Sequence, residues 1–195
     1  MEEVIRFILE LDKLKGVTRK TRPLGLDRYE NSAEHTWQIA MFASALVPQF
    51  APKLDLNHMV AMLLVHDVGE IDTGDTIVFT EGGWAERKAA ELAAVRRIFG
   101  LLPEPQASRF VTLWEEFELG DTAEARFARA IDRAMPALLN LANNGQSWRE
   151  NRISYQRVVD RVGPEVAAGC PALWAWMEPR LKAANDGGWF GINAR

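Results

Sequence analysis

The sequence predicts an all-α fold, and three features indicate it. Apolar residues recur at intervals of three or four along most of the chain, as on the buried face of a helix. Polar capping patterns precede several of these segments. The alternation typical of strands is nearly absent, and only residues 76–79 have extended character. The 195 residues suit one domain better than two. We therefore expect one domain, residues 1–195, built as a bundle of roughly seven or eight helices.

The first half of the chain is expected to hold four of these helices. One begins at a capping box, in which Asn31 precedes Glu34 by three positions, and it stops near Pro48. An arginine-rich loop, residues 17–30, and a glycine-punctuated loop, residues 70–83, separate helices. The four helices are predicted at residues 4–16, 31–48, 55–69 and 84–99.

The second half should hold the other four helices. Two of them are expected to begin at capping boxes, formed by Asp121 with Glu124 and by Ser147 with Glu150. These four helices are predicted at residues 104–118, 121–142, 147–162 and 171–184.

Composition and charge exclude several classes of function. The net charge of −4 provides no basic field for a long polyanion, so no nucleic acid polymer is expected as a partner. The single cysteine, Cys170, excludes an intramolecular disulfide and a cysteine-rich metal site, which fits the cytoplasm. The acidic, amphipathic start does not resemble a signal peptide, and no apolar run suggests a membrane span.

An acidic cluster interrupts the chain where a buried helix is expected to end. The stretch LLVHDVGEIDTGD, residues 63–75, holds His66, Asp67, Glu70, Asp72 and Asp75. Carboxylates this close repel one another, and a divalent cation would neutralise them. Histidine with carboxylate suits borderline-to-hard divalent metals. Because adjacent helical side chains point about 100° apart, the doublet shares a metal only if both side chains lean toward one pocket, with further ligands from other helices.

Two distant residues are the best candidates for those further ligands. His35 lies in the first turn of the capped helix, and Asp132 lies inside the apolar run RFARAIDRAMPALLNLA, where the helix should face the core. A lone aspartate on a core face needs a partner, which a metal would supply. The remaining histidine, His58, is expected to be structural.

Each of these residues also has a structural interpretation. His35 can be a core histidine with one hydrogen bond, and the doublet of His66 and Asp67 can end a helix beside solvent. Asp132 can pair with Arg129 or Arg133, and the acids of the glycine-rich stretch can form an exposed loop. Together these alternatives require several coincidences.

Three segments, ENSAEHTWQIAMFASAL, LLVHDVGEIDTGD and ARAIDRAMPALLN, together resemble the HD-domain phosphohydrolases. The family's order is a histidine, a His-Asp doublet and a distant aspartate. Within the superfamily the chain is most similar to the short 5'-deoxynucleotidases of the YfbR and HD-domain-containing protein 2 type. The resemblance covers residues 5–160, while the C-terminal helix and aromatic tail, residues 171–195, carry no family motif.

The resemblance implies a site and a cofactor. It suggests one divalent ion per chain: Mn²⁺, Co²⁺ or Mg²⁺, with Zn²⁺ or Fe²⁺ as other occupants. The arginine that meets the substrate phosphate falls on Arg19, with Arg22 as its neighbour, and a surface arginine is the structural alternative. Lys20 stands where the bacterial enzymes have an aromatic residue that contacts the nucleoside. The metal ligands fall on His35, His66, Asp67 and Asp132, and the two catalytic acids on Glu70 and Asp75.

The implied activity is hydrolysis of (deoxy)nucleoside 5'-monophosphates to nucleoside and phosphate. Three alternatives remain open: phosphodiester or nucleoside triphosphate hydrolysis at the same site, a catalytically silent nucleotide-binding module, and a helical interaction protein. The chain lacks the GYP motif of cyclic-dinucleotide phosphodiesterases. The resemblance also suggests a homodimer, with Trp174, Trp176 and Trp189 as candidate contacts.

Overall fold

The computed structural model describes residues 1–191, and within them the chain is helical with no β-strand. Eight helices have ten residues or more, which confirms the predicted all-α class and the number of long helices. A β-bridge between Thr18 and Asn31 is the extended pairing in this part of the chain. The elements are α1 (Glu2–Leu11), a 3-10 helix η1 (Asp12–Gly16), α2 (Ser32–Phe50), α3 (Leu56–Val65), α4 (Glu70–Thr73), α5 (Trp84–Phe99), α6 (Gln106–Leu119), α7 (Ala123–Ala142), α8 (Gln146–Glu150), α9 (Tyr155–Gly169) and α10 (Pro171–Asp186).

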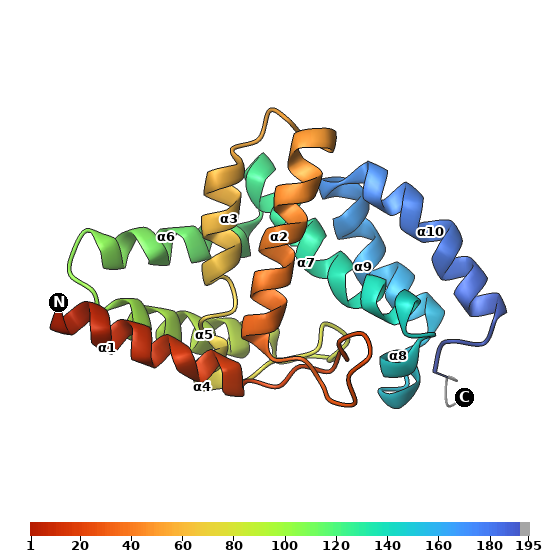
Figure 1. Ribbon diagram of the computed structural model, residues 1–195, viewed down its shortest axis with the longest axis horizontal. Coiled ribbons are helices and arrows are strands. Elements are labelled where there is room, and N and C mark those ends of the chain that lie inside the picture. The colour runs from red at the N-terminus through yellow and green to blue at the C-terminus, as the bar shows by residue number, and fades with distance from the viewer. Residues whose placement is uncertain (192–195) are drawn as a thin grey trace.

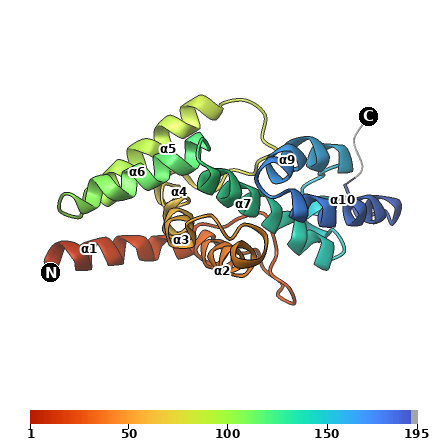
Figure 2. The same ribbon diagram turned by 90° about the horizontal axis from the view of Figure 1, so that it is seen from above.

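Helix α7 forms the centre of the molecule. It contacts α2, α3 and α6 on one side and α9 and α10 on the other. Figure 1 shows α1, α3, α5 and α6 grouped on the left, α8 to α10 on the right, and α2 crossing in front of α7. Figure 2 shows α1 and α2 on the same side of the molecule. Ala128, Ile131 and Ala134 of α7 are fully buried, so a polar side chain in this part of the helix has little access to water.

The predicted capping box at the start of α2 is present. The Glu34 backbone N–H donates to Asn31 Oδ1 at 2.9 Å, and the Asn31 N–H donates to Glu34 Oε2 at 3.1 Å. Two of the orphan donors of the first turn are thereby satisfied. The cap fixes where α2 begins, and it therefore places His35 in the first turn.

The predicted cap of α7 is wrong by one residue. Thr122, not Asp121, precedes the helix, and its hydroxyl accepts from the Ala125 N–H at 3.1 Å. The backbone of Thr122 is extended, as an N-cap requires. Glu124 does not complete a box, because its carboxylate accepts from the Asp55 N–H instead.

The helix predicted at residues 147–162 is two helices, α8 and α9. Arg152 has φ +54°, a left-handed conformation that a continuing α-helix cannot accept. Gly145 precedes α8 in place of a Ser147 cap, and Ser154 caps α9 by accepting from the Arg157 N–H at 3.3 Å. Helix α9 then continues through Pro164 to end at Gly169, beyond the predicted end.

The helix predicted at residues 55–69 ends early, at Val65. The next residues form turns whose N–H groups bond three residues back, as in Val68 N–H to Val65 O at 3.2 Å. Helix α4 follows where a loop was expected, and residues 76–79 form no strand. The backbone at His66 and at Gly69 stays in the right-handed helical region, so a tighter turn joins α3 to α4 and carries the His-Asp doublet.

Helices α7 and α9 approach closely at Gly169. A Cβ at this position would lie 2.2 Å from the Arg126 carbonyl oxygen and 2.7 Å from Ala130 Cβ. We expect Gly169→Ala to lower the free energy of unfolding by about 1–3 kcal/mol or more, because the backbones must separate. Urea denaturation measures the loss in free energy of unfolding. Gly16→Ala is the control, since a Cβ at Gly16 meets nothing within 4 Å. Equal effects of the two substitutions would contradict the prediction.

Candidate metal centre

Three side chains from distant parts of the chain converge at the core. His35 comes from the first turn of α2, His66 from the turn after α3, and Asp132 from the middle of α7. His35 Nε2 lies 2.9 Å and His66 Nε2 lies 3.7 Å from the same Asp132 oxygen, Oδ1. One ligand atom from each residue lies within 4.8 Å of the others, a spacing that one metal ion can bridge.

Asp67, the second residue of the His-Asp doublet, also lies in this group. Its Oδ1 lies 3.0 Å from His66 Nε2, while its Oδ2 accepts from Arg19 Nη1 at 3.0 Å. Both neighbours line one pocket, although the backbone at His66 is still helical, with φ −60° and ψ −39°. Their side chains therefore lean toward each other. On a continuous helix their side chains would diverge by about 100°.

The donor set fits a divalent cation, and His66 shows this most clearly. Its Nδ1–H donates to the Leu63 carbonyl at 2.7 Å, so Nε2 is the nitrogen that faces the cluster. The Trp114 indole donates to the His66 carbonyl at 3.0 Å and holds the residue in place. Nε2 is buried without a hydrogen-bond partner and faces oxygens of Asp67 and Asp132. A cation between these acceptors would satisfy all of them.

The electrostatics of the cluster match that arrangement. Burial disfavours charge on the Asp132 carboxyl, but hydrogen bonds from His35 and His66 outweigh it and hold its pKa well below the usual value. Burial likewise opposes ionisation of Asp67, yet His66 and Arg19 lower its pKa to about 2. Burial opposes charge on His66, but the Asp67 and Asp132 carboxylates outweigh it and raise its pKa well above 6.5. A cation at this place would displace the Nε2 proton. Burial and the nearby Arg19 lower the pKa of His35 to about 4.

The two predicted catalytic acids flank the cluster. Glu70 is buried, and its Oε2 accepts from Ser32 Oγ at 2.6 Å. Asp75 Oδ1 lies 3.5 Å from Arg19 Nη1. Burial raises the pKa of both carboxyls, and the negative charge of Asp67 raises them further. Both acids therefore hold a proton more readily than an exposed carboxylate does.

The two predicted arginines lie in different surroundings. The Arg19 side chain is only 12% exposed and lines the pocket beside the carboxylates. Arg22 pairs with Asp27 at 2.8 Å and with Glu150 at 3.1 Å, and it is not among the residues that line the pocket. The structure therefore brings Arg19 to the cluster and leaves Arg22 away from it. Lys20, next in the chain, does line the pocket.

The structural alternatives for the acids do not match the observed contacts. Arg129 and Arg133 both pair with Glu165, at 3.1 and 3.2 Å, and leave Asp132 to the histidines. Among the acids after the doublet, Asp72 is the exposed one; it lies in helix α4 and pairs with Arg97. His58 Nε2 lies 2.7 Å from Glu116 Oε2, and His58 is not among the residues that line the pocket.

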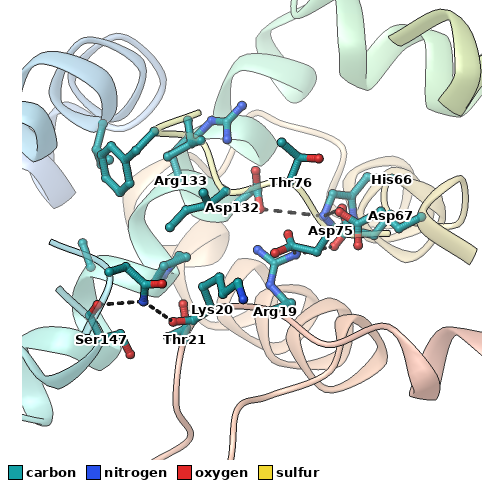
Figure 3. A pocket seen from close by; sticks show the side chains of 18 of the residues that line it. Arg19, Lys20, Thr21, His66, Asp67, Asp75, Thr76, Asp132, Arg133 and Ser147 are labelled. Atoms are coloured by element: carbon teal, nitrogen blue, oxygen red, sulfur yellow. Dashed lines mark hydrogen bonds and ion pairs between the residues drawn. The ribbon is translucent and has the colours of Figure 1, made fainter. Parts of the chain in front are cut away.

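The metal-ligand candidates lie at one end of a longer pocket. Figure 3 shows Asp67, Asp75 and Asp132 close to Arg19, with Lys20, Thr21 and Ser147 farther along. The rest of the lining includes four charged residues, Lys88, Glu91, Glu118 and Arg133. Most of its other residues are apolar, with two amides, and include Ile77, Phe79, Pro136, Asn140, Trp148, Asn151, Ile153, Val158 and Val162.

Glu30 and Ser32 are site residues that the sequence did not predict. Glu30 Oε1 lies 3.3 Å from Arg19 Nε, and Ser32 holds Glu70. Burial raises the pKa of Glu30 to about 7, although Arg19 opposes the rise. Both precede the first histidine in the stretch ENSAEH, residues 30–35, in which the sequence pattern indicates only the helix cap of Asn31 and Glu34. The burial of Glu30 depends on the path of the preceding loop, which leaves no periodic signal.

The comparison with known families agrees with this geometry. Residues 11–174 match the family model of the HD domain. The chain belongs to the HD-domain family. The resemblance of its three motif segments is thereby confirmed, and this HD domain carries the ligand types of a divalent metal site at His35, His66 and Asp132.

Curated relatives and a solved structure extend the comparison. The HD-domain chain is 28% identical over 133 residues to 5'-deoxynucleotidase HDDC2 of Homo sapiens, covering 66% of this chain but less than two thirds, 64%, of that protein. It is 30% identical over 134 residues to a 5'-deoxynucleotidase of Erwinia tasmaniensis, covering 65% of this chain and 67% of that protein. The crystal structure of a predicted metal-dependent phosphohydrolase from Magnetospirillum magnetotacticum matches with a TM-score of 0.90 at 35% identity, and the match covers 98% of each chain.

Proposed function

We propose that this HD-domain protein is a metal-dependent phosphomonoesterase that hydrolyses (deoxy)nucleoside 5'-monophosphates to nucleoside and phosphate. The observation that carries the proposal is the convergence of His35, His66 and Asp132 beside Arg19 at one end of a pocket. The names of the curated relatives point to the same activity.

One divalent ion per chain is the proposed cofactor, held by His35, His66, Asp67 and Asp132. Mn²⁺, Co²⁺ and Mg²⁺ suit this mixed nitrogen and oxygen set, and Zn²⁺ or Fe²⁺ fit it as well. When bound, the ion supplies Lewis-acid polarisation of the phosphoryl group and neutralises charge as the leaving oxygen departs. The buried, unpartnered Nε2 of His66 supports its role as a ligand.

The side chains around the cluster have complementary roles in this proposal. Arg19 binds phosphate oxygens through the planar guanidinium fork, which matches their geometry. Asp75 and Glu70 position the attacking water and accept its proton, a task for which their raised pKa values suit them. The apolar lining beyond Lys20 accommodates the nucleoside. Because Lys20 stands in place of an aromatic residue, the nucleoside meets an ammonium group at this position and not a ring on which it could stack.

The direct test is phosphate release from deoxy- and ribonucleoside 5'-monophosphates after chelation and after re-addition of each metal. We expect no release from the chelated protein and recovery with at least one of the ions. Release that survives complete chelation would overturn the proposal.

The same assay separates the alternatives when a phosphodiester and a nucleoside triphosphate are included. Faster cleavage of either would assign the site to that substrate class. Tight nucleotide binding without turnover in any metal would assign the protein to the silent binding modules.

The role of Arg19 gives a second prediction. We expect Arg19→Lys to lower kcat/KM by about 10–100-fold, because an ammonium cannot replace the bidentate, charge-assisted hydrogen bonds of the fork. Arg22→Lys is the matched control, since Asp27 and Glu150 already engage that guanidinium. Steady-state kinetics on one monophosphate measures both. Equal losses in the two variants would mean that phosphate is not bound at Arg19 in particular.

We further propose that the protein is a cytoplasmic homodimer. No helix within residues 1–191 is long and apolar enough to cross a membrane. Trp176 is 48% exposed, whereas Trp174 and Trp189 are partly buried against the core. A larger exposed apolar set lies on α1 and α2, which share one side of the molecule (Figure 2). Sedimentation equilibrium tests the assembly, and a monomer at micromolar concentration would contradict it. The α1 and α2 set comprises Val4, Ile5, Ile8, Leu9, Trp37, Met41 and Phe50.

A further inference from the structure

Glu30 is a buried carboxylate with no assigned role, and the backbone fixes its place. The segment before α2 folds back on itself, so that the Arg19 N–H donates to the Glu30 carbonyl at 3.0 Å and the Glu30 N–H donates to the Thr21 carbonyl at 2.9 Å. The residue is only 2% exposed. A glutamate this deeply buried is rare unless its charge has a partner.

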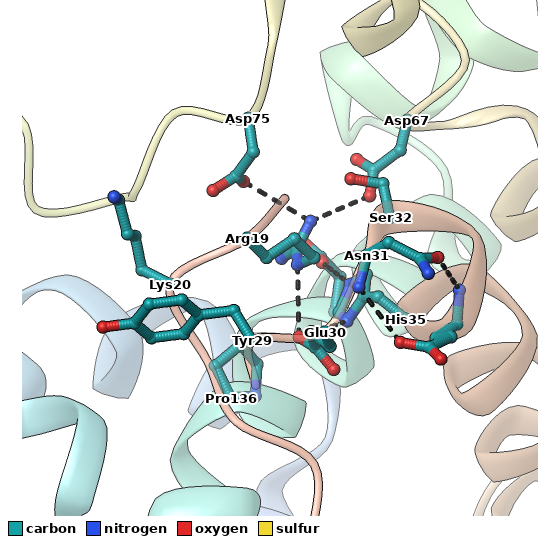
Figure 4. Close-up of polar contacts among 12 residues, drawn as sticks. Arg19, Lys20, Tyr29, Glu30, Asn31, Ser32, His35, Asp67, Asp75 and Pro136 are labelled. Carbon is teal, nitrogen blue, oxygen red and sulfur yellow. Dashed lines mark hydrogen bonds and ion pairs between the residues drawn. The ribbon is translucent and has the colours of Figure 1, made fainter. Parts of the chain in front are cut away.

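Two nitrogens of the site face the same oxygen of Glu30. Its Oε1 lies 3.3 Å from Arg19 Nε and 3.8 Å from His35 Nδ1. All three atoms are buried, and none has a hydrogen-bond partner of good geometry. Figure 4 shows Glu30 on one side of the Arg19 guanidinium and Asp67 and Asp75 on the other. Glu30 thus lies behind both the arginine and the histidine, away from the substrate side.

The chemistry of a metal-bound histidine explains why an acceptor lies there. A neutral imidazole that gives Nε2 to a cation carries its proton on Nδ1, and that N–H needs an acceptor to fix the ring. For His66 the acceptor is the Leu63 carbonyl. For His35 the nearby acidic oxygen is Glu30 Oε1, which the arginine also approaches.

We propose that Glu30 is a positioning residue that joins the metal ligand His35 to the phosphate-binding Arg19. In the metal-bound protein Oε1 would accept from His35 Nδ1–H and from Arg19 Nε–H, which lie 3.8 and 3.3 Å away here, and this would set the distance between the cation and the guanidinium. The inference rests on the proposed function, because it assigns the metal and the phosphate to these two side chains. It predicts that metal binding and phosphate binding are coupled through Glu30.

The test compares Glu30→Gln with the wild-type protein by titration calorimetry. Mn²⁺ is titrated into metal-free protein, and inorganic phosphate into metal-free and Mn²⁺-loaded protein. In the wild type we expect Mn²⁺ to tighten phosphate binding. In Glu30→Gln we expect Mn²⁺ affinity to fall about 10–100-fold, the usual effect of losing a carboxylate behind a ligand histidine, and the coupling to phosphate to disappear.

Two further variants make the result specific. Glu34→Gln removes a nearby carboxylate whose polar partners are Arg28 and the Asn31 N–H, and glutamine still suits the capping box. It should bind Mn²⁺ as the wild type does. Glu30→Asp keeps the charge but shortens the side chain by one methylene, so it should weaken Mn²⁺ binding by a smaller factor. If Glu30→Gln does not fold, Glu30→Asp provides the test in its place.

Calorimetry also separates this inference from the proposed function. Folded Glu30 variants with wild-type Mn²⁺ affinity and intact coupling would overturn the role of Glu30, even if the wild-type protein hydrolyses monophosphates. Weakened metal binding with no turnover in the wild type would instead keep Glu30 as a positioning residue and refute only the enzymatic reaction.

Discussion

Asp132→Asn should lower kcat for monophosphate hydrolysis by about 1,000-fold or more, because the loss of the cation removes several kcal/mol of transition-state stabilisation. Asp132 Oδ1 is the atom that both histidines approach, at 2.9 and 3.7 Å. An amide has nearly the same shape but no charge, so it is a much weaker ligand. Phosphate release at saturating substrate and metal measures the effect.

The control for this substitution is Asp72→Asn. Asp72 is an exposed acid of the same acidic stretch as the doublet, and it pairs with Arg97 on the surface. Activity should stay within about threefold of the wild type, since exposed ion pairs contribute little. An Asp132→Asn protein that keeps a tenth of the wild-type kcat would show that this side chain does not hold the catalytic ion.

Metal removal should destabilise the folded protein as well as inactivate it. A ligand at 100 times its Kd stabilises the folded state by about 2.7 kcal/mol, which corresponds to roughly 5–10 °C in Tm for a chain of this size. We expect chelation to lower Tm by this amount and Mn²⁺ to restore it, as measured by calorimetry.

The same experiment on His66→Ala shows where the metal acts. This variant lacks the nitrogen that is buried without a hydrogen-bond partner, so Mn²⁺ should leave its Tm almost unchanged. A shift as large as that of the wild type would place the stabilising ion elsewhere in the protein.

The fold could be predicted from the sequence wherever a local signal decides the structure. The side chains of Asn31 and Glu34 each accept from the other residue's backbone N–H, so that cap is visible in the sequence. The break at Arg152 and the early end of α3 at Val65 are not visible, because tertiary packing fixes those turns. The division into a motif-bearing core and a C-terminal helix with its tail stays a prediction, and residues 192–195 of that tail lie outside the described residues.

The candidate site was predictable through residue types that are costly to bury. Histidine and aspartate in apolar segments identified His35, His66 and Asp132 without any knowledge of which helices meet. Glu30 was not predicted as a site residue because it lies in a loop, where burial follows from long-range contacts. Arg22 was expected beside Arg19, yet its guanidinium pairs with Glu150 and Asp27.

Anomalous diffraction from crystals grown with Mn²⁺ or Co²⁺ tests the central claim most directly. The account predicts one strong peak per chain, within bonding distance of His35 Nε2, His66 Nε2 and the Asp67 and Asp132 carboxylates. A fully loaded crystal without a peak among these four side chains, or with its only peak elsewhere, would contradict it.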